Sequence, residues 1–211
     1  MTIIRQIKLR RWFPAHDEFA ACVLRLCILR EDFTLELQAI HASSIESLDK
    51  HSATWRRLYF YRKMVGTLFE IRRALQCLLK IAEWQQLLEA GPPKWRTHFI
   101  DLVKKLEEDR QLIKDTRNMI GGHVLQKGVA QVLKDMEHDA FSYLEVGAKK
   151  KQTHYVFAGE ITARMLVTDV PEAKRNEEIE RRAKSISRHL PVSNLIDIIF
   201  TMYVDSRKLA D

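Results

Sequence analysis

Residues 53–89 read ATWRRLYFYRKMVGTLFEIRRALQCLLKIAEWQQLLE, and this stretch decides the fold class. Apolar residues recur along it three and four positions apart, at Leu58, Tyr61, Val65, Leu68, Leu75, Leu79 and Ala82. That spacing is typical of an α-helix packed against other helices. Gly91-Pro92-Pro93 follows and predicts the end of the helix, because two prolines cannot continue one.

Similar spacing on either side predicts helices over 16–45 and over 93–120. Beyond Val124 we expect shorter helices over 129–138, 160–167 and 171–188, and a last helix from Pro191. Segments 141–146 and 152–157 are rich in aromatic and β-branched residues and flank a Gly-Ala-Lys-Lys-Lys turn, which favours one small β-hairpin.

The expected architecture is therefore all-α: a bundle of long antiparallel helices with a C-terminal helical extension and one small β-hairpin. At 211 residues the chain suits a single domain over 1–211, with a helical core over 16–140 and the extension over 141–211. Its 46% apolar and 30% charged residues are ordinary for a globular protein and exclude wholesale disorder.

The composition also restricts location and partners. Lys and Arg number 35 against 28 Asp and Glu, and the net charge of +7 favours polyanions such as RNA. No apolar run reaches the roughly 18 residues of a membrane span, so we expect no membrane partner. Cys22, Cys27 and Cys77 form no Cys-x-x-Cys pair and are expected to be buried free thiols, as in the reducing cytoplasm.

Several common enzyme motifs are missing from the sequence. It has no Gly-rich phosphate loop, no His-Glu-x-x-His and no Gly-x-Ser-x-Gly. Enzymes of those classes are therefore disfavoured, and we expect no cofactor and no metal.

The predicted helix over 93–120 contains arginines on its apolar side. The positions that would share this side are Val103, Leu106, Arg110, Ile113, Arg117 and Ile120. Because burying a guanidinium is costly, Arg117 needs a polar cavity, a ligand or a carboxylate. The structural interpretation is that Arg117 extends out to water or pairs with a glutamate of a neighbouring helix.

His123 follows Arg117 by six positions, which separates the two by about 120° on an ideal helix. Gly121-Gly122 between them allows the helix to bend or end, so that the imidazole can turn back beside the guanidinium. The alternative is that His123 only caps a helix C-terminus, where a cation is favourable.

The string Asp115-Thr116-Arg117-Asn118-Met119-Ile120-Gly121-Gly122-His123 resembles the signature of HEPN domains (higher eukaryotes and prokaryotes nucleotide-binding). In that signature an Arg and a polar residue, often Asn, are followed by a His after four to six intervening residues. Arg117, Asn118 and His123 fit it, and the resemblance covers about 16–140.

The resemblance implies a metal-independent endoribonuclease that acts as a homodimer, typically a toxin or phage-defence effector that works with an antitoxin or regulatory protein. His123 would move the proton and Arg117 would bind the phosphate. Asn118 would orient the phosphate or hold the imidazole of His123. The product would be a 2′,3′-cyclic phosphate. The alternative is a non-catalytic helical module for RNA binding or protein interaction, in which Arg117 and His123 hold a helix junction together.

Further cations and aromatic rings could contact RNA. The basic positions are Arg56-Arg57, Arg62-Lys63, Arg72-Arg73 and Lys149-Lys150-Lys151, and the nearby rings are Trp55, Tyr59 and Tyr61. The alternative is that the cations lie on solvated surfaces and that the rings pack in the core.

Overall fold

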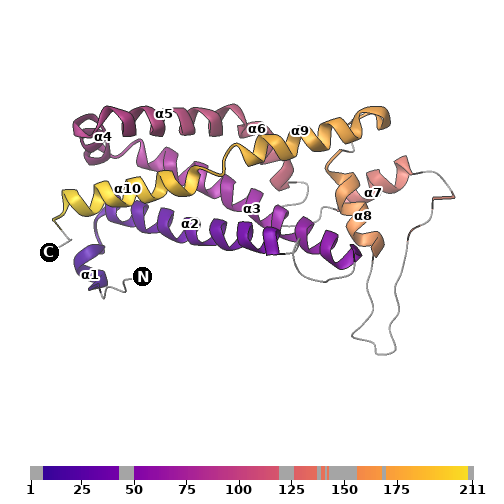
Figure 1. Cartoon of the computed structure of the whole chain (residues 1–211), viewed down its shortest axis with the longest axis horizontal. Coiled ribbons are helices and arrows are strands. Elements are labelled where there is room, and N and C mark those ends of the chain that lie inside the picture. The colour runs from indigo at the N-terminus through magenta and orange to yellow at the C-terminus, as the bar shows by residue number, and fades with distance from the viewer. Residues whose placement is uncertain are drawn as a thin grey trace. The chain divides into compact units, whose positions relative to one another are not determined.

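The computed structural model describes residues 7–42, 50–118, 126–136, 139–140, 142, 156–167 and 170–208. All regular elements in these residues are helical, which confirms the all-α class (Figure 1). The helices are α1 Leu9–Trp12, α2 Glu18–Ala42, α3 Lys50–Leu78, α4 Ala82–Ala90, α5 Pro93–Glu108, α6 Arg110–Thr116, α7 Gln126–Asp135, α8 Val156–Met165, the short 3-10 helix η3 Glu172–Lys174, α9 Arg175–Ser187 and α10 Val192–Ser206. Within these ranges no helix is long and apolar enough to cross a membrane.

The chain forms two compact units, each assembled from separate stretches of sequence. Unit 1 comprises Met1–Phe33, Glu70–Glu108 and His189–Asp211, and unit 2 comprises Thr34–Phe69 and Asp109–Arg188. Helices α2 and α3 contribute residues to both units. The expected core over 16–140 and extension over 141–211 follow other bounds, and the single domain expected over 1–211 stays a prediction.

Unit 1 has an aromatic core around Trp84 of α4, whose side chain is buried. The centroid of the Trp84 ring lies 5.2 Å from that of Phe99 on α5 and 6.2 Å from that of Phe19 on α2. Phe19 also meets Tyr203 of α10 edge-on at 5.2 Å. Aromatic pairs at such separations add about 0.5–1.5 kcal/mol beyond the burial of their area. These rings therefore hold four helices around one core.

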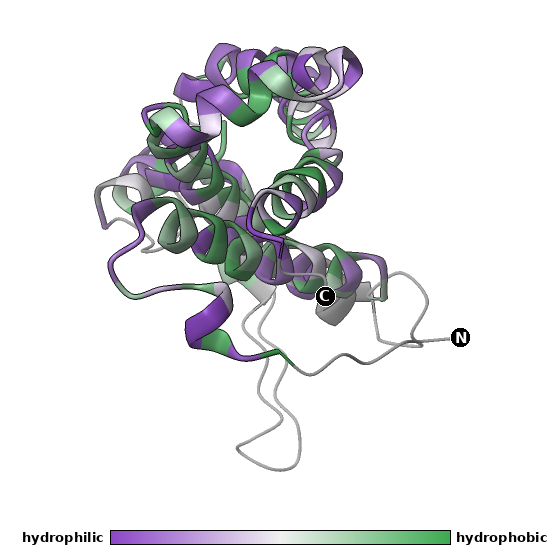
Figure 2. Ribbon diagram, turned by 90° about the vertical axis from the view of Figure 1, so that its left-hand side faces the viewer, coloured by the Kyte–Doolittle hydropathy of each residue, from purple (hydrophilic) through white to green (hydrophobic). Residues whose placement is uncertain are grey.

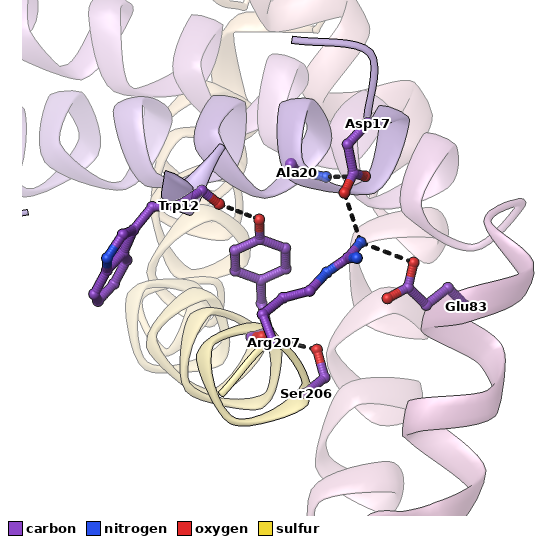
Figure 3. Close-up of polar contacts among 7 residues, drawn as sticks. Trp12, Asp17, Ala20, Glu83, Ser206 and Arg207 are labelled. Carbon is purple, nitrogen blue, oxygen red and sulfur yellow. Dashed lines mark hydrogen bonds and ion pairs between the residues drawn. The ribbon is translucent and has the colours of Figure 1, made fainter. Parts of the chain in front are cut away.

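Arg207, just after α10, connects three parts of unit 1 (Figure 3). Its Nη2 donates to Oδ2 of Asp17 at 2.6 Å and to Oε2 of Glu83 at 3.0 Å. Asp17 also accepts a hydrogen bond from the backbone N–H of Ala20, which caps the start of α2. The hydroxyl of Tyr203 donates to the carbonyl of Trp12. These contacts fix the end of α10 against the start of α2 and against α4.

Unit 2 has a smaller apolar core where α7 packs against α8. Val132 of α7 is buried with Met165, Leu166 and Val167, at and beyond the end of α8. Gly128 of α7 permits close approach, because a Cβ there would meet Cε of Met165 at 2.6 Å. In Figure 2 hydrophobic and hydrophilic residues alternate around single helices, as expected for elements with one buried side.

Two of the predicted helices were expected to be continuous and are interrupted. The helix over 53–89 breaks at Lys80-Ile81, and the helix over 93–120 breaks at Asp109. Leu78 and Trp84 are both buried, although a six-residue separation would place them about 120° apart on one continuous helix. The break before α4 lets both side chains enter the core. Gly91-Pro92-Pro93 ends α4 as predicted, with Pro93 as the first residue of α5.

The predicted β-hairpin falls mostly outside the described residues. Of its second segment, 152–157, the structure describes Val156 and Phe157, and both belong to α8. For these two residues the strand assignment was wrong. Alternation of aromatic and β-branched residues over so short a stretch does not distinguish a strand from the first turn of a helix.

Candidate functional site

Arg117 lies directly after α6, where its backbone N–H donates to the carbonyls of Ile113 and Lys114. Arg117 and Asn118 continue the helix as a wider π-helical turn. Ile113 and Thr116 are fully buried and hold the end of α6 in unit 2. The next two side chains, those of Arg117 and Asn118, are exposed. Such π turns are frequent at functional sites.

The two arginines expected on a buried apolar side do not lie there. Arg110 and Arg117 are exposed, whereas Ile113 and Leu106 are buried. Arg110, Ile113 and Arg117 all follow the break at Asp109, and the two arginines lie about 60° and 40° round the helix from Ile113, so Ile113 can face the core while both arginines face solvent. Arg117 therefore does not bear the desolvation cost of a buried guanidinium.

The guanidinium of Arg117 rests on an aromatic ring. Its Cζ lies 4.5 Å from the centroid of Phe69 on α3, and Nη1 donates to Oδ1 of Asn118 at the long distance of 3.5 Å. Among the described residues Arg117 makes no ion pair with a carboxylate. A cation–π contact orients the guanidinium while leaving its charge and most of its donors available to an anion.

His123 lies outside the described residues, as do 119–122 and 124–125. The structure therefore gives the surroundings of Arg117 and Asn118 only. The approach of the imidazole to the guanidinium, which the Gly pair allows, stays a prediction.

Asp109 is a buried carboxylate of unit 2 that the sequence did not single out. Its Oδ2 accepts hydrogen bonds from Oγ of Ser185 at 2.5 Å and from Nε of Arg188 at 2.7 Å, and Oδ1 pairs with Nη2 of Arg188 at 2.7 Å. The carboxylate of Asp109 and the guanidinium of Arg188 thus form a bidentate ion pair. It ties the residue before α6 to α9 and so positions α6.

Glu178 of α9 forms a second ionic cluster in unit 2. It pairs with Arg181 and with the buried Arg182 at 2.6 Å each. Hydrogen bonds first from Arg181 and then from Arg182 outweigh burial and lower the pKa of Glu178 to about 2. Burial raises the pKa of Tyr61 to about 12, although the charge of Arg182 acts in the opposite direction.

Of the residues expected to contact RNA, some have exposed side chains and others are buried. Arg72 is buried and pairs with Glu107 at 2.7 Å, so it is structural. Tyr61 packs against the core of unit 2, whereas Trp55 and Tyr59 are exposed. The exposed cations are Arg57, Lys63 and Arg73, with Arg56 and Arg62 half-buried. Lys149-Lys150-Lys151 lies outside the described residues.

The expectation of three buried thiols was wrong for Cys77, which is exposed. Cys22 is buried, and its Sγ donates to the carbonyl of Ala74 at 3.5 Å; Cys27 is half-buried. Burial raises the pKa of Cys22 and of Cys27 to about 11. In the part of the chain that the structure describes, no three His, Cys, Asp or Glu residues cluster as metal ligands would.

Comparisons of the chain with protein-family models, with curated proteins and with solved structures found no match. The assignment of a function therefore depends on the residues themselves.

Proposed function

We propose that this protein is a metal-independent endoribonuclease whose catalytic residues are Arg117, Asn118 and His123. The observation that carries the proposal is the setting of Arg117: its guanidinium is exposed, rests on Phe69 and has no carboxylate partner among the described residues. An arginine that only held helices together would be expected to pair with an acidic side chain, as Arg72 does with Glu107.

The reaction uses the nucleophile that RNA itself carries. His123 accepts the proton of the 2′-hydroxyl, whose oxygen attacks the adjacent phosphorus. The bond to the 5′-oxygen breaks, and that oxygen takes a proton from the imidazolium or from water as it leaves. The products are a 2′,3′-cyclic phosphate and a 5′-hydroxyl end. The histidine suits this role because the ordinary pKa of imidazole, about 6.5, lies close to neutrality.

Arg117 stabilises the negative charge that builds up on the phosphorane oxygens. Its planar donors match two phosphate oxygens at once, and its position over Phe69 holds the plane of the guanidinium in one orientation. The amide of Asn118, next to it and exposed, orients the phosphate or the imidazole.

The resemblance to HEPN domains supports the wider proposal. The protein would act in the cytoplasm as a homodimer that brings two Arg/His sets to one RNA cleft. It would serve as a toxin or phage-defence effector under the control of an antitoxin or regulatory protein. The alternative function is a non-catalytic helical module for RNA binding or protein interaction, and the exposed rings of Trp55 and Tyr59 favour its RNA-binding form.

The test is cleavage of a labelled tRNA pool in EDTA by the native protein and by Arg117→Ala, Asn118→Ala and His123→Ala. Arg110→Ala is the matched control, since Arg110 is an exposed arginine of the same short helix. Circular dichroism checks that each variant keeps the native helix content.

We expect the native protein and Arg110→Ala to leave cyclic-phosphate ends. Arg117→Ala and His123→Ala should lose at least about a hundredfold in rate, as for removal of a general base or an oxyanion-stabilising group. No cleavage over a broad set of RNAs would favour the binding module. Equal cleavage by all folded variants would point to a contaminant or another site and overturn the mechanism.

A further inference from the structure

One face of α3 presents aromatic rings and cations to solvent. Trp55 and Tyr59 are 40% and 42% exposed. The opposite face of this helix carries the buried Met64 and Leu68. The packing of α3 therefore leaves the face with Trp55 and Tyr59 free for another molecule.

The rings on this face are aligned. At about 100° per residue, Trp55, Tyr59, Arg62 and Phe69 fall within about 40° of one line along α3. We call these four residues the α3 track. At about 1.5 Å per residue the α3 track is about 21 Å long, or about six nucleotides at a stacked rise of about 3.4 Å.

The charge along the α3 track has one sign. Residues 55–69 contain Arg56, Arg57, Arg62 and Lys63 and no acidic residue. The Nζ of Lys63 lies 5.8 Å from the centroid of the Tyr59 ring. Glu36 contacts this part of α3 through Thr67, about 120° round the helix from Trp55. Within residues 55–69, a polyanion would meet cations next to the rings and no acidic residue of the same segment.

The α3 track ends at the candidate catalytic residues, because Phe69 is the ring that lies beneath Arg117. All of these residues belong to unit 2. A strand that lay along the rings from Trp55 would reach the guanidinium of Arg117 at its far end.

We infer that the α3 track binds a single-stranded nucleic acid, whose bases stack on Trp55 and Tyr59 and whose phosphates meet Arg62 and Lys63. Only an unpaired strand can place its bases flat against protein rings, and each such contact is tolerant of sequence. Two parts of this inference rest on the proposed function. They are that the strand is RNA and not DNA, and that its scissile phosphate reaches Arg117. The α3 track then makes single-stranded RNA the substrate class.

The test measures binding without cleavage, in full-length protein carrying His123→Ala. The probes are fluorescein-labelled decauridine, decathymidine and a ten-base-pair RNA duplex, followed by anisotropy at several salt concentrations. Trp55→Ala and Tyr59→Ala remove the rings, Tyr59→Phe keeps one, and Arg62→Gln removes a charge. Phe157→Ala is the matched control, because Phe157 of α8 is equally exposed at 42% and lies in the same unit.

We expect Trp55→Ala and Tyr59→Ala each to raise the Kd for decauridine at least about fivefold, in line with the loss of one stacked base. Tyr59→Phe and Phe157→Ala should leave it unchanged. Arg62→Gln should reduce the slope of log Kd against the logarithm of the salt concentration by about the amount expected for the loss of one phosphate contact. The duplex should bind more weakly than either single strand. If decathymidine binds as tightly as decauridine, the stacking is supported and the α3 track binds single-stranded DNA as well as single-stranded RNA.

An unchanged Kd in the folded Trp55→Ala and Tyr59→Ala variants would overturn the inference, as would tighter binding of the duplex. Failure of the proposed function is a separate outcome. If the track variants weaken binding while the native protein cuts no RNA, the α3 track stands without the nuclease. If the native protein cuts RNA while the track variants change neither Kd nor KM, the nuclease stands without the α3 track.

Discussion

The guanidinium of Arg117 lies over the ring of Phe69, with Cζ 4.5 Å from the ring centroid. A carboxylate in the same place would neutralise the arginine and compete with a phosphate for its donors. A ring holds the guanidinium by its quadrupole and leaves it cationic. The contact thus orients the residue that we propose to stabilise the transition state.

Replacing Phe69 by Leu should slow RNA cleavage about two- to fivefold, which corresponds to the roughly 0.5–1 kcal/mol of an exposed cation–π contact. Leucine keeps most of the packing of this half-buried side chain but removes the ring. Single-turnover cleavage rates in EDTA are the measurement, with Phe69→Tyr as the control that retains a ring. Equal rates for the leucine variant and the native protein would show that the ring does not position Arg117.

Asp109→Ala should lower the free energy of unfolding by about 2–3 kcal/mol. The substitution removes a charge-assisted contact with Arg188 and leaves the hydroxyl of Ser185 without its acceptor. Urea denaturation followed by circular dichroism measures the change. Asp101→Ala, at an exposed position of α5, is the control and should lie within about 0.5 kcal/mol of the native protein. A small loss in Asp109→Ala would mean that this contact does not hold α6 and α9 together.

The sequence predicted the helices because their apolar spacing is a local signal. The breaks at Lys80-Ile81 and at Asp109 have no such signal, since neither contains Gly or Pro. Both breaks depend on tertiary contacts. The break at Lys80-Ile81 lets Leu78 and Trp84 both be buried, and at the other break Asp109 is bound by Ser185 and Arg188.

The candidate site was only partly predictable for the same reason. Arg117 and Asn118 were singled out by their spacing from His123, but the expected position of Arg117 on a buried apolar side was wrong. Its contact with Phe69 joins two helices that are distant in sequence, and no spacing rule marks such a pair. Helical spacing did distinguish two neighbouring rings, since Tyr61, on the predicted apolar side, packs inward and Tyr59, two positions away, is exposed.

Glu178 should make the stability of the protein depend on pH in the acid range. Its pKa falls from an ordinary value near 4.5 to about 2 in the folded state, chiefly through the hydrogen bond from Arg181. A carboxyl group whose pKa is lower in the folded state stabilises fully above its unfolded pKa. That contribution is lost as the pH falls from about 4.5 to about 2. Denaturation of the native protein and of Glu178→Gln should differ most near pH 6 and converge towards pH 2. A difference independent of pH would contradict the lowered pKa.

The three thiols should react at two clearly different rates. At pH 8 a thiol with a pKa of about 11 is only about 0.1% ionised, so Cys22 and Cys27 should be slow, and Cys22 is also buried. Cys77 is exposed and should react first with an aromatic disulfide reagent. We expect one fast thiol per native chain and three after denaturation. Cys77→Ser should abolish the fast phase, and a fast phase that survives this substitution would assign it to another cysteine.

Arg207→Met should lower the free energy of unfolding by about 2 kcal/mol, because hydrogen bonds to charged groups contribute about 1.5–3 kcal/mol each and this guanidinium is partly solvated. Methionine retains the apolar stem but leaves Asp17 and Glu83 without their cation (Figure 3). Arg96→Met, an exposed position of α5 in the same unit, is the control. If the loss comes from the uncompensated carboxylates, adding Asp17→Asn and Glu83→Gln to Arg207→Met should recover part of it. No recovery in the triple variant would show that Arg207 stabilises unit 1 through its contact with the Tyr203 ring and not through its pairing with the two carboxylates.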